Sequence, residues 1–274
     1  MFKIRKKYSL FALFFALTFS AYSQFEFPVV GSRGAAMGGV SVGLKDFCST
    51  IDNIAGLSYL NNRYIGIGFA ENFMLSELSY KSIQMAVPIS GINAMALRYT
   101  HFGNIGYSEQ RVAMQYAQRL GLYVSLGVEL DYLHCGTSDV YYDKYNNVSF
   151  AVALQVRPSD GWVIGLYAFN PLGRVVDTDI SIASLFKLGA SYAVSPLLEA
   201  AVEVEKNVYM KHNIRWGLEY KVFDFMFARI GFSTCPILYT FGVGLVTGDL
   251  NIDFSAHVHN SLGVSPNITV NYSF

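Results

Sequence analysis

The sequence lacks any long apolar run after its first residues. No stretch there approaches the ~20 consecutive apolar residues that a membrane-spanning helix requires, so a helical membrane protein is excluded. Charged residues are scarce, at 15% of the chain, although 52% of the residues are hydrophobic and 15% are aromatic. Low-complexity tracts are absent and aromatic residues are plentiful, which excludes a disordered protein. Hydrophobicity spread over short segments is typical of a β-barrel, in which only every second residue faces lipid.

Cysteine is rare, with three in 274 residues: Cys48, Cys135 and Cys235. An odd number in an exported protein leaves at least one thiol unpaired. Cys135 and Cys235 both fall in expected outer loops, and they would pair only if those loops bring their Cα atoms within ~7 Å. No cysteine directly follows the export signal described next, so a lipoprotein anchor is not indicated.

An excess of basic residues is missing once the export signal is set aside. Residues 1–23 are typical of a secretory signal peptide, because a basic start precedes the apolar stretch 10–19 and small residues end it. We expect cleavage before Gln24. Its removal takes away four of the 20 basic residues and no acidic one, which leaves 16 basic against 20 acidic residues. We therefore expect no nucleic-acid partner.

The rest of the chain is dominated by the alternation of apolar and polar residues. In the segment 250–259, Ile252 and Phe254 lie on one face, whereas Asp253 lies on the other. Such a period of two is typical of a strand whose faces meet different environments. A soluble sandwich alternates as well, so the number and length of the segments must decide between the two folds.

About fourteen such segments can be placed, most of them close to the ~9–11 residues with which a strand crosses a bilayer. The expected strands are 64–71, 76–87, 91–101, 107–118, 122–133, 146–157, 162–170, 184–194, 197–206, 212–221, 223–232, 238–247, 249–259 and 266–274. Their even number suits a closed bacterial barrel, and the even-numbered connections are tight turns, whereas the longest loops are odd-numbered. The sequence therefore predicts an all-β protein, a transmembrane antiparallel β-barrel of about 14 strands over residues 63–274.

Residues 24–62 break the alternation. They are rich in glycine and other small residues, and a short helix is expected over 46–57. Barrels of about eight strands are filled by their own side chains, while those of ~16–18 strands leave an aqueous channel. A fourteen-strand lumen would leak unless something occupied it. We therefore expect residues 24–62 to fold into the lumen as a hatch, or plug.

This N-terminal stretch resembles a known family. Its runs Gly31-Ser32-Arg33-Gly34-Ala35-Ala36-Met37-Gly38-Gly39 and Asn53-Ile54-Ala55-Gly56-Leu57, with Asp46 between them, are similar to the opening of the PorV/PorQ group, a Bacteroidetes branch of the FadL-like outer-membrane proteins. The resemblance implies a fourteen-strand barrel with a luminal hatch. The hatch motif would consist of Gly34, Met37, Gly38, Gly39, Asn53, Ala55, Gly56 and Leu57. Ile54 stands where the group has proline, so the fixed turn of the group is lost at that point.

The polar face of the strands carries charges of both signs. The residues expected to line the lumen are Arg98, Arg111, Glu129, Asp131, Lys187, Glu199, Glu203, Glu205, Arg215, Glu219, Arg229, Asp253 and His257. Ion pairs and hydrogen bonds among them would hold the hatch in a wet interior. Alternatively, they would form a polar pathway for a solute.

No catalytic constellation stands out. His257 and His259 lie on one strand face and could meet a metal ion, but no cysteine or third histidine is placed beside them by the sequence. An outer-membrane lipase or deacylase would need a serine or histidine base at the lipid face, whereas these histidines point inward. We therefore expect no enzyme, no metal and no cofactor.

Two function classes remain, beside a third possibility, an orphan structural barrel, that the sequence does not remove. The PorV/PorQ resemblance implies an accessory of protein secretion or surface assembly of the type IX kind, with secretion-system subunits or secreted cargo as partners. The wider FadL-like resemblance implies passive transport of a hydrophobic small molecule, with a hatch that moves and a ligand that leaves sideways through a wall opening. Short outer loops leave little surface for capturing a ligand, which favours the accessory role.

The last strand ends in aromatic residues. Tyr272 and Phe274 close an alternating segment, and a terminal aromatic residue resembles the signal that the barrel-assembly machinery recognises. Together with the signal peptide, this ending predicts a place in the outer membrane of a Gram-negative cell, with lipid around the barrel.

Overall fold

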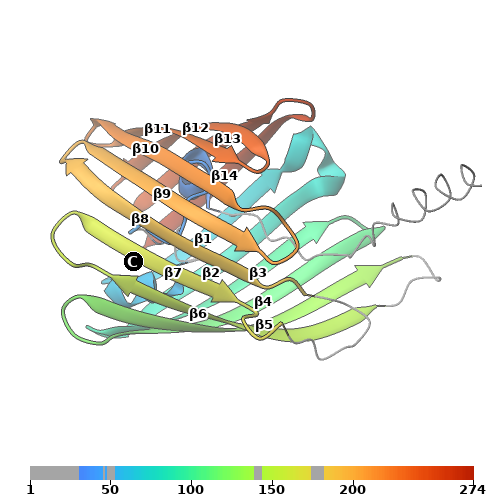
Figure 1. Cartoon of the computed structure of the whole chain (residues 1–274), viewed down its shortest axis with the longest axis horizontal. Helices are drawn as coiled ribbons and strands as arrows, with labels where there is room; N and C mark the ends of the chain where they lie inside the picture. The colour runs from blue at the N-terminus through green and yellow to red at the C-terminus, as the bar shows by residue number, and fades with distance from the viewer. Residues whose placement is uncertain (1–30, 46, 48–52, 139–143, 174–181) are drawn as a thin grey trace, which may run out of the picture.

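A computed structural model describes residues 31–45, 47, 53–138, 144–173 and 182–274 (Figure 1). The expected signal peptide and Cys48 lie outside these residues. The strands are β1 (Tyr64–Glu71), β2 (Ser79–Ser90), β3 (Asn93–Gly103), β4 (Tyr107–Arg119), β5 (Val124–Thr137), β6 (Tyr145–Val156), β7 (Trp162–Phe169), β8 (Leu185–Ser195), β9 (Leu198–Asn207), β10 (Asn213–Phe223), β11 (Met226–Thr234), β12 (Ile237–Thr247), β13 (Leu250–His259) and β14 (Gly263–Ser273). The short helices are α2 (Ser32–Ala36), η2 (Ile54–Tyr59), η3 (Asn72–Met74) and η4 (Ser76–Leu78).

The strands close into a single antiparallel barrel. Each strand pairs with its neighbours along the chain, and β1 closes the ring by pairing with β14, from Tyr64 opposite Ser273 to Ala70 opposite Asn267. Figure 1 shows the strands running obliquely around the barrel. The prediction of a closed fourteen-strand antiparallel barrel is confirmed.

The two ends of the barrel differ in their connections. At one end, here called the turn end, β1 begins, β14 ends and the even-numbered connections are short, the longest being residues 157–161 between β6 and β7. The opposite end is here called the loop end, and its longest connection is residues 170–184 between β7 and β8. Outer-membrane barrels keep their short turns in the periplasm and their longer loops outside, which assigns the turn end to the periplasm.

The expected strand limits agree with the observed ones to within about four residues, and two of the differences lie at the loop end. β5 continues to Thr137, which pairs with Tyr107 of β4, and β14 begins at Gly263, opposite His259 of β13. Near the loop end both faces of a strand can meet water, so the alternation that marks a strand in the sequence fades while the backbone pairing continues. Cys135 therefore lies in β5 and not in a loop.

The two faces of the wall have opposite chemistry. Outward-facing side chains such as Ile67, Leu188 and Ile230 are apolar and exposed, whereas inward-facing carboxylates such as Glu203 and Asp131 are fully buried. This arrangement suits a wall with lipid outside and a filled polar interior. Among the described residues, no helix is long and apolar enough to cross a membrane.

The apolar outward face predicts the cost of a charge placed on it. Phe254 lies in the middle of β13 and is 48% exposed on this face. We expect Phe254→Arg to lower the free energy of unfolding in lipid vesicles by ~2–4 kcal/mol, because arginine near the bilayer midplane costs about that much in a barrel. Urea titration of the protein refolded into vesicles measures the change.

Ile105→Arg is the matched control, since Ile105 is 93% exposed in the connection between β3 and β4 at the loop end. A charge there meets water in the folded protein and should leave the unfolding free energy unchanged. Equal losses for the two variants would contradict the orientation of the wall.

Candidate functional site

The interior of the barrel is occupied by residues 31–45, 47 and 53–60, here called the luminal segment. It begins against β14, where the Ser32 N–H donates to Thr269 Oγ1 (2.9 Å). It then crosses the inward faces of successive strands and reaches β9, where the Ser41 N–H donates to Glu203 Oε2 (2.8 Å). Its second part, η2, packs against β3 to β6 across the lumen. Its role as a hatch stays a prediction.

Glycines in the wall mark the path of the luminal segment. A Cβ atom at Gly242 of β12 would lie 2.6 Å from the Cβ of Ala36, and one at Gly217 of β10 would lie 2.6 Å from the Cα of Met37. Gly217 is paired directly with Gly231 of β11. The wall glycines at which an added Cβ would come within 3.0 Å of the luminal segment are Gly66, Gly127, Gly165, Gly189, Gly217, Gly231 and Gly242. Glycine within a strand often marks a close approach of another backbone, and here it makes room for the segment.

The first half of the hatch motif surrounds α2. Gly34 lies in this helix, and Met37, which caps its C-terminus, is fully buried. Gly38 and Gly39 follow with φ angles of +76° and +87°, a region that glycine enters without a steric penalty. A Cβ at Gly38 would also lie 2.6 Å from the carbonyl oxygen of Trp216. The backbone of the luminal segment is therefore in direct contact with the backbone of the wall at this point.

The second half of the motif forms η2. Asn53 caps this helix, because its Oδ1 accepts from the Gly56 N–H (3.3 Å) and its Nδ2 donates to the Leu44 carbonyl (3.0 Å). Ile54 is fully buried and lies against Gly127. The turn that the resemblance assigns to a proline at position 54 is thus held by the Asn53 side chain.

Ala55 and Leu57, the remaining motif residues, are fully buried in η2. The helix expected over residues 46–57 differs from the observed one, which runs from Ile54 to Tyr59. Position 46 and positions 48–52 lie outside the described residues. The sequence did not predict α2, because Ser32–Ala36 is too short to develop a helical period.

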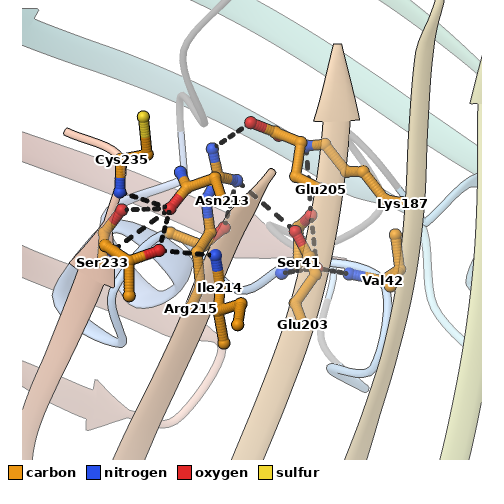
Figure 2. A network of polar contacts seen from close by, with 12 residues as sticks. Ser41, Val42, Lys187, Glu203, Glu205, Asn213, Ile214, Arg215, Ser233 and Cys235 are labelled. Carbon is orange, nitrogen blue, oxygen red and sulfur yellow. Dashed lines mark hydrogen bonds and ion pairs between the residues drawn. The ribbon is translucent and has the colours of Figure 1, made fainter. Parts of the chain in front are cut away.

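A polar network joins the luminal segment to β9 and β10 (Figure 2). Glu203 is fully buried, and its Oε2 accepts from the N–H groups of Ser41 (2.8 Å) and Val42 (3.0 Å). Arg215 donates from Nη1 to the Gly39 carbonyl (3.0 Å) and lies 3.4 Å from Glu203 Oε1. The luminal segment does not pair as a strand, so its backbone groups form hydrogen bonds with side chains of the wall instead.

The same network extends toward the loop end. Arg215 Nη2 lies 2.6 Å from Glu205 Oε1, and Lys187 Nζ lies 3.5 Å from Glu205 Oε2. Figure 2 shows Asn213 beside Cys235, and the Asn213 Oδ1 accepts from the Cys235 N–H (3.0 Å). Charges on three adjacent strands are therefore compensated within the wall.

A second network centres on Arg33 of α2. Its guanidinium donates from Nε and Nη2 to the two carboxylate oxygens of Glu219, both at 2.8 Å, and Nη2 also reaches Glu199 (3.0 Å). Arg229 binds the same Glu219 (2.6 Å) and Asp253 (2.5 Å). Such bidentate pairing fixes geometry as well as charge. Arg33 stands within the resembling run but was absent from the predicted site residues.

A third network lies on β3, β4 and β5. Glu129 is buried between Arg98 (3.2 Å) and Arg111 (2.7 Å), and Arg111 also binds Asp131 (2.6 Å). Gln115 donates to Glu129 as well. The charged residues expected to line the lumen thus face inward and meet in three clusters. Their role in holding a hatch or guiding a solute stays a prediction.

A cavity of about 290 Å³ lies at the loop end, and it is bounded by residues of the first and third networks and by η3. Its apolar lining is Phe73, Tyr80, Tyr167, Phe169, Leu185 and Leu238. Its charged lining is Arg111, Lys187, Glu205, Lys211 and Arg215, and all of these except Lys211 take part in the ion pairs above. The cavity thus combines an aromatic and aliphatic part with polar groups, and small-molecule sites use both kinds of side chain.

Phe73 holds a strained backbone at the edge of this cavity. Phe73 and its neighbour Met74 have φ angles of +57° and +56°, which bulky residues rarely adopt. The Phe73 N–H donates to Ser265 Oγ (2.8 Å), and its ring meets that of His259 edge-on at 6.1 Å. Strain of this kind gathers at functional sites and persists only where the surroundings enforce it.

The outward face carries an apolar groove behind the cavity. This groove, of about 570 Å³, runs over β5 to β9 and is lined mainly by aliphatic side chains such as Val152, Leu166 and Leu188. It also touches Tyr167 and Lys187, which are paired across β7 and β8 and line the interior cavity as well. The same two residues therefore border both the inside and the outside of the wall.

The seam between β6 and β7 is short. Its pairing runs from Val156 opposite Ile164 to Ala151 opposite Phe169, with one further bond from the Asn170 N–H to the Phe150 carbonyl. Within the part of the chain that the structure describes, positions 145–149 of β6 pair only with β5. Among the described strands, this is the shortest pairing in the wall, and it lies beside the cavity and the groove.

The remaining predicted residues lie at the two ends of the barrel. His257 and His259 line the loop-end cavity, and the described residues hold no group of three or more histidine, cysteine or acidic side chains suited to a metal. Cys135 and Cys235 are free thiols. At the turn end, the exposed rings of Tyr272 and Phe274 stack with centroids 6.1 Å apart.

No protein-family model matches the chain, and no curated protein matches its sequence. Solved structures match its fold. The toluene transporter TbuX of Ralstonia pickettii gives a TM-score of 0.72 at 12% identity, with 91% of this chain and 100% of that chain covered. A FadL homologue of Pseudomonas aeruginosa gives 0.67 at 10% identity, with 92% and 100% covered. The Pseudomonas putida toluene transporter TodX gives 0.67 at 11% identity, with 92% and 99% covered.

These comparisons correct one expectation. None of the structures named above belongs to a secretion system, and they are hydrocarbon transporters or their homologues, so the predicted role as an accessory of type IX secretion is wrong. That prediction relied on short outer loops, whereas the cavity is lined by inward-facing wall residues together with residues of those short connections, such as Phe73 and Met210. The chain has the closed fourteen-strand fold of the FadL-type outer-membrane hydrocarbon transporters.

Proposed function

We propose that this barrel carries small hydrophobic molecules passively from the loop end into the outer membrane. One observation carries the proposal: the loop-end cavity and the apolar outer groove are both bordered by Tyr167 and Lys187. A hydrophobic molecule in the cavity is thus separated from lipid by a single strand pair. The transfer needs no energy source, because the ligand moves from water into an apolar phase.

The ligand class follows from the cavity and from its neighbours. A volume of about 290 Å³ is at the lower end of the ~300–1,000 Å³ of ligand pockets, which suits a compact molecule. Apart from Lys211, the charged residues of the lining are held in ion pairs, so the ligand would contact mainly aromatic and aliphatic side chains. TbuX and TodX are described as toluene transporters and CymD as a monoaromatic hydrocarbon channel. We therefore propose a ligand of monoaromatic size and polarity.

The route runs sideways. A ligand passes Phe73 at the loop end, enters the cavity and leaves beside the short β6–β7 seam into the apolar groove. The luminal segment closes the way to the turn end as a hatch, so the ligand reaches lipid and not the periplasm. No step on this route breaks a covalent bond, and we propose that the protein is not an enzyme. The resemblance of residues 31–57 to the PorV/PorQ group stays a prediction and carries no part of this proposal.

Filling the cavity tests this function. Leu185 lines the cavity at the start of β8, and Leu185→Trp would occupy the space of the ligand. We expect the initial rate of radiolabelled toluene uptake to fall to the background rate, in cells whose outer membrane otherwise lacks a hydrocarbon channel. The wild-type protein should raise that rate and leave the uptake of a charged solute unchanged.

Leu172→Trp is the matched control, because Leu172 is 66% exposed in the β7–β8 connection and does not line the cavity. It should transport toluene as the wild type does. If the wild-type protein fails to raise toluene uptake, or if Leu185→Trp and Leu172→Trp are indistinguishable, the proposal is wrong.

A further inference from the structure

Two arginines converge on one aromatic ring at the turn end. Arg119 is the last residue of β4, and Arg157 follows the last residue of β6. The guanidinium carbon of Arg157 lies 3.3 Å from the centroid of the Tyr59 ring, and that of Arg119 lies 5.0 Å from it. Tyr59 is the last residue of η2, so wall and luminal segment meet here.

Neither of these arginines has an acidic partner among the residues that the structure describes. Of the described arginines, Arg33, Arg98, Arg111, Arg215 and Arg229 each bind at least one carboxylate inside the barrel. In the same part of the chain, no ion pair involves Arg119 or Arg157, and the Nε atom of each is buried without a hydrogen-bond partner. Two like charges thus stand together in a barrel that otherwise compensates its interior charges.

Burial and repulsion both act on Arg157. Its removal from water lowers the pKa of the guanidinium below its ordinary value, Tyr59 opposes this change, and the positive charge of Arg119 adds to it. An anion held between the two guanidiniums would relieve the repulsion. Arginine suits this task, because its planar fork matches the oxygens of a carboxylate or a phosphate group.

Neutral polar groups without partners lie next to the arginines. Ser125 and Gln155 are fully buried, and the Ser125 hydroxyl and both amide atoms of Gln155 lack a hydrogen-bond partner. Arg119 is paired with Ser125 across β4 and β5, and Ser125 is paired with Gln155 across β5 and β6. Paired residues hold their Cβ atoms ~4.5–5.5 Å apart, so these side chains form one row on the inward face. Buried polar groups rarely stay unpaired in native proteins, and each such group calls for a partner.

We propose that Arg119 and Arg157, with Ser125 and Gln155 beside them, form a binding site for one carboxylate or phosphate group at the turn end. The site is distinct from the hydrocarbon route, which uses the loop-end cavity. Because Tyr59 belongs to the luminal segment and both arginines belong to the wall, an anion bound here ties the segment to the wall. The anion comes either from a free solute or from a lipid headgroup, and both present the same oxygens.

The purified full-length protein in a neutral detergent tests the site. Inorganic phosphate and sodium acetate are titrated separately, with sodium chloride at the same ionic strength as the reference. We expect phosphate or acetate to raise the melting temperature saturably and to give binding heat by calorimetry. A short-chain phosphatidate forms a second arm, and a shift with phosphatidate alone assigns the site to a lipid headgroup. The absence of any shift beyond that of chloride in all three titrations would overturn the proposal.

Variants separate the site from general charge effects. Arg157→Gln should abolish the saturable shift, and Arg157→Lys, which keeps the charge but not the fork, should weaken it. Arg63→Gln is the control, since Arg63 is an exposed arginine at the same end, and it should bind as the wild type does. If Arg157→Gln fails to fold, Arg119→Gln gives the same comparison, and the calorimetry of the wild type against Arg63→Gln still decides whether a saturable site exists. Equal binding by Arg157→Gln and the wild type would overturn the proposal.

Discussion

Replacing Gly217 with alanine should unseat the luminal segment and open the barrel to ions. The added Cβ would lie 2.6 Å from the Cα and the carbonyl oxygen of Met37, and a fully buried backbone has nowhere to move. Overpacking of this kind costs typically ~1–3 kcal/mol, and the segment cannot shift toward the paired Gly231, because it already lies against that residue. We expect a higher single-channel conductance in planar bilayers than for the wild type, together with faster tryptic cleavage at Arg33.

Gly91→Ala is the matched control for this substitution. Gly91 lies in the turn between β2 and β3 and has no atom within 4 Å of the position that a Cβ would take. It should therefore behave as the wild type does in conductance and proteolysis. An unchanged conductance of Gly217→Ala would show that the luminal segment does not close the pore, and would remove the hatch from the proposed mechanism.

Removing the Arg33 guanidinium should have the second large effect. Arg33→Met would leave Glu199 without its partner and Glu219 with Arg229 alone. Breaking a buried ion pair costs ~3–5 kcal/mol, because the remaining charge stays out of water without compensation. We expect a loss of about 3 kcal/mol in the unfolding free energy, at the low end of that range, since Arg229 still binds Glu219. Urea titration in lipid vesicles measures this loss.

Lys221→Met provides the comparison at an exposed ion pair. Lys221 binds Asp224 at 2.8 Å at the turn end, but Asp224 is fully exposed. An ion pair in water contributes little to stability, so this variant should unfold as the wild type does. If both variants lost the same amount, the buried network around Arg33 would have no special role in seating the segment.

The barrel itself could be predicted from the sequence because lipid and lumen impose different residue types on alternate positions. Leu250 to His259 shows this pattern, and β13 has the bounds Leu250–His259. Where water reaches both faces, as beyond position 133 of β5, the pattern ends before the strand does. The strand count survives this error, since each strand needs only its lipid-facing part to be recognised.

The inward direction of the charged residues followed from the same alternation, but their partners did not. Arg215 binds Glu203 and Glu205 because β9 and β10 are paired in one register. The sequence alone does not show which residue of β9 lies opposite which residue of β10. Arg33 was missed for a related reason, since no strand period assigns a direction to a residue in an irregular segment.

The wall glycines carried a signal that the alternation alone does not explain. Gly165, Gly217 and Gly231 lie at inward positions, where polar side chains are the rule for a lumen. Each glycine taken alone shows only that a residue of low β-propensity stands in a strand. Their recurrence on the inward face of neighbouring strands is typical of a close approach by another backbone. The function prediction was wrong because it took short outer loops as evidence against ligand capture.

The contact between Ser32 and Thr269 joins residues 237 positions apart in the chain. Bonds between such distant residues form late, because the entropy of closing the intervening chain has to be overcome before they contribute. The luminal segment is made first, yet its partners on β14 and β12 are made last. The luminal segment can therefore form these contacts only after the strands at the opposite end of the chain have been made.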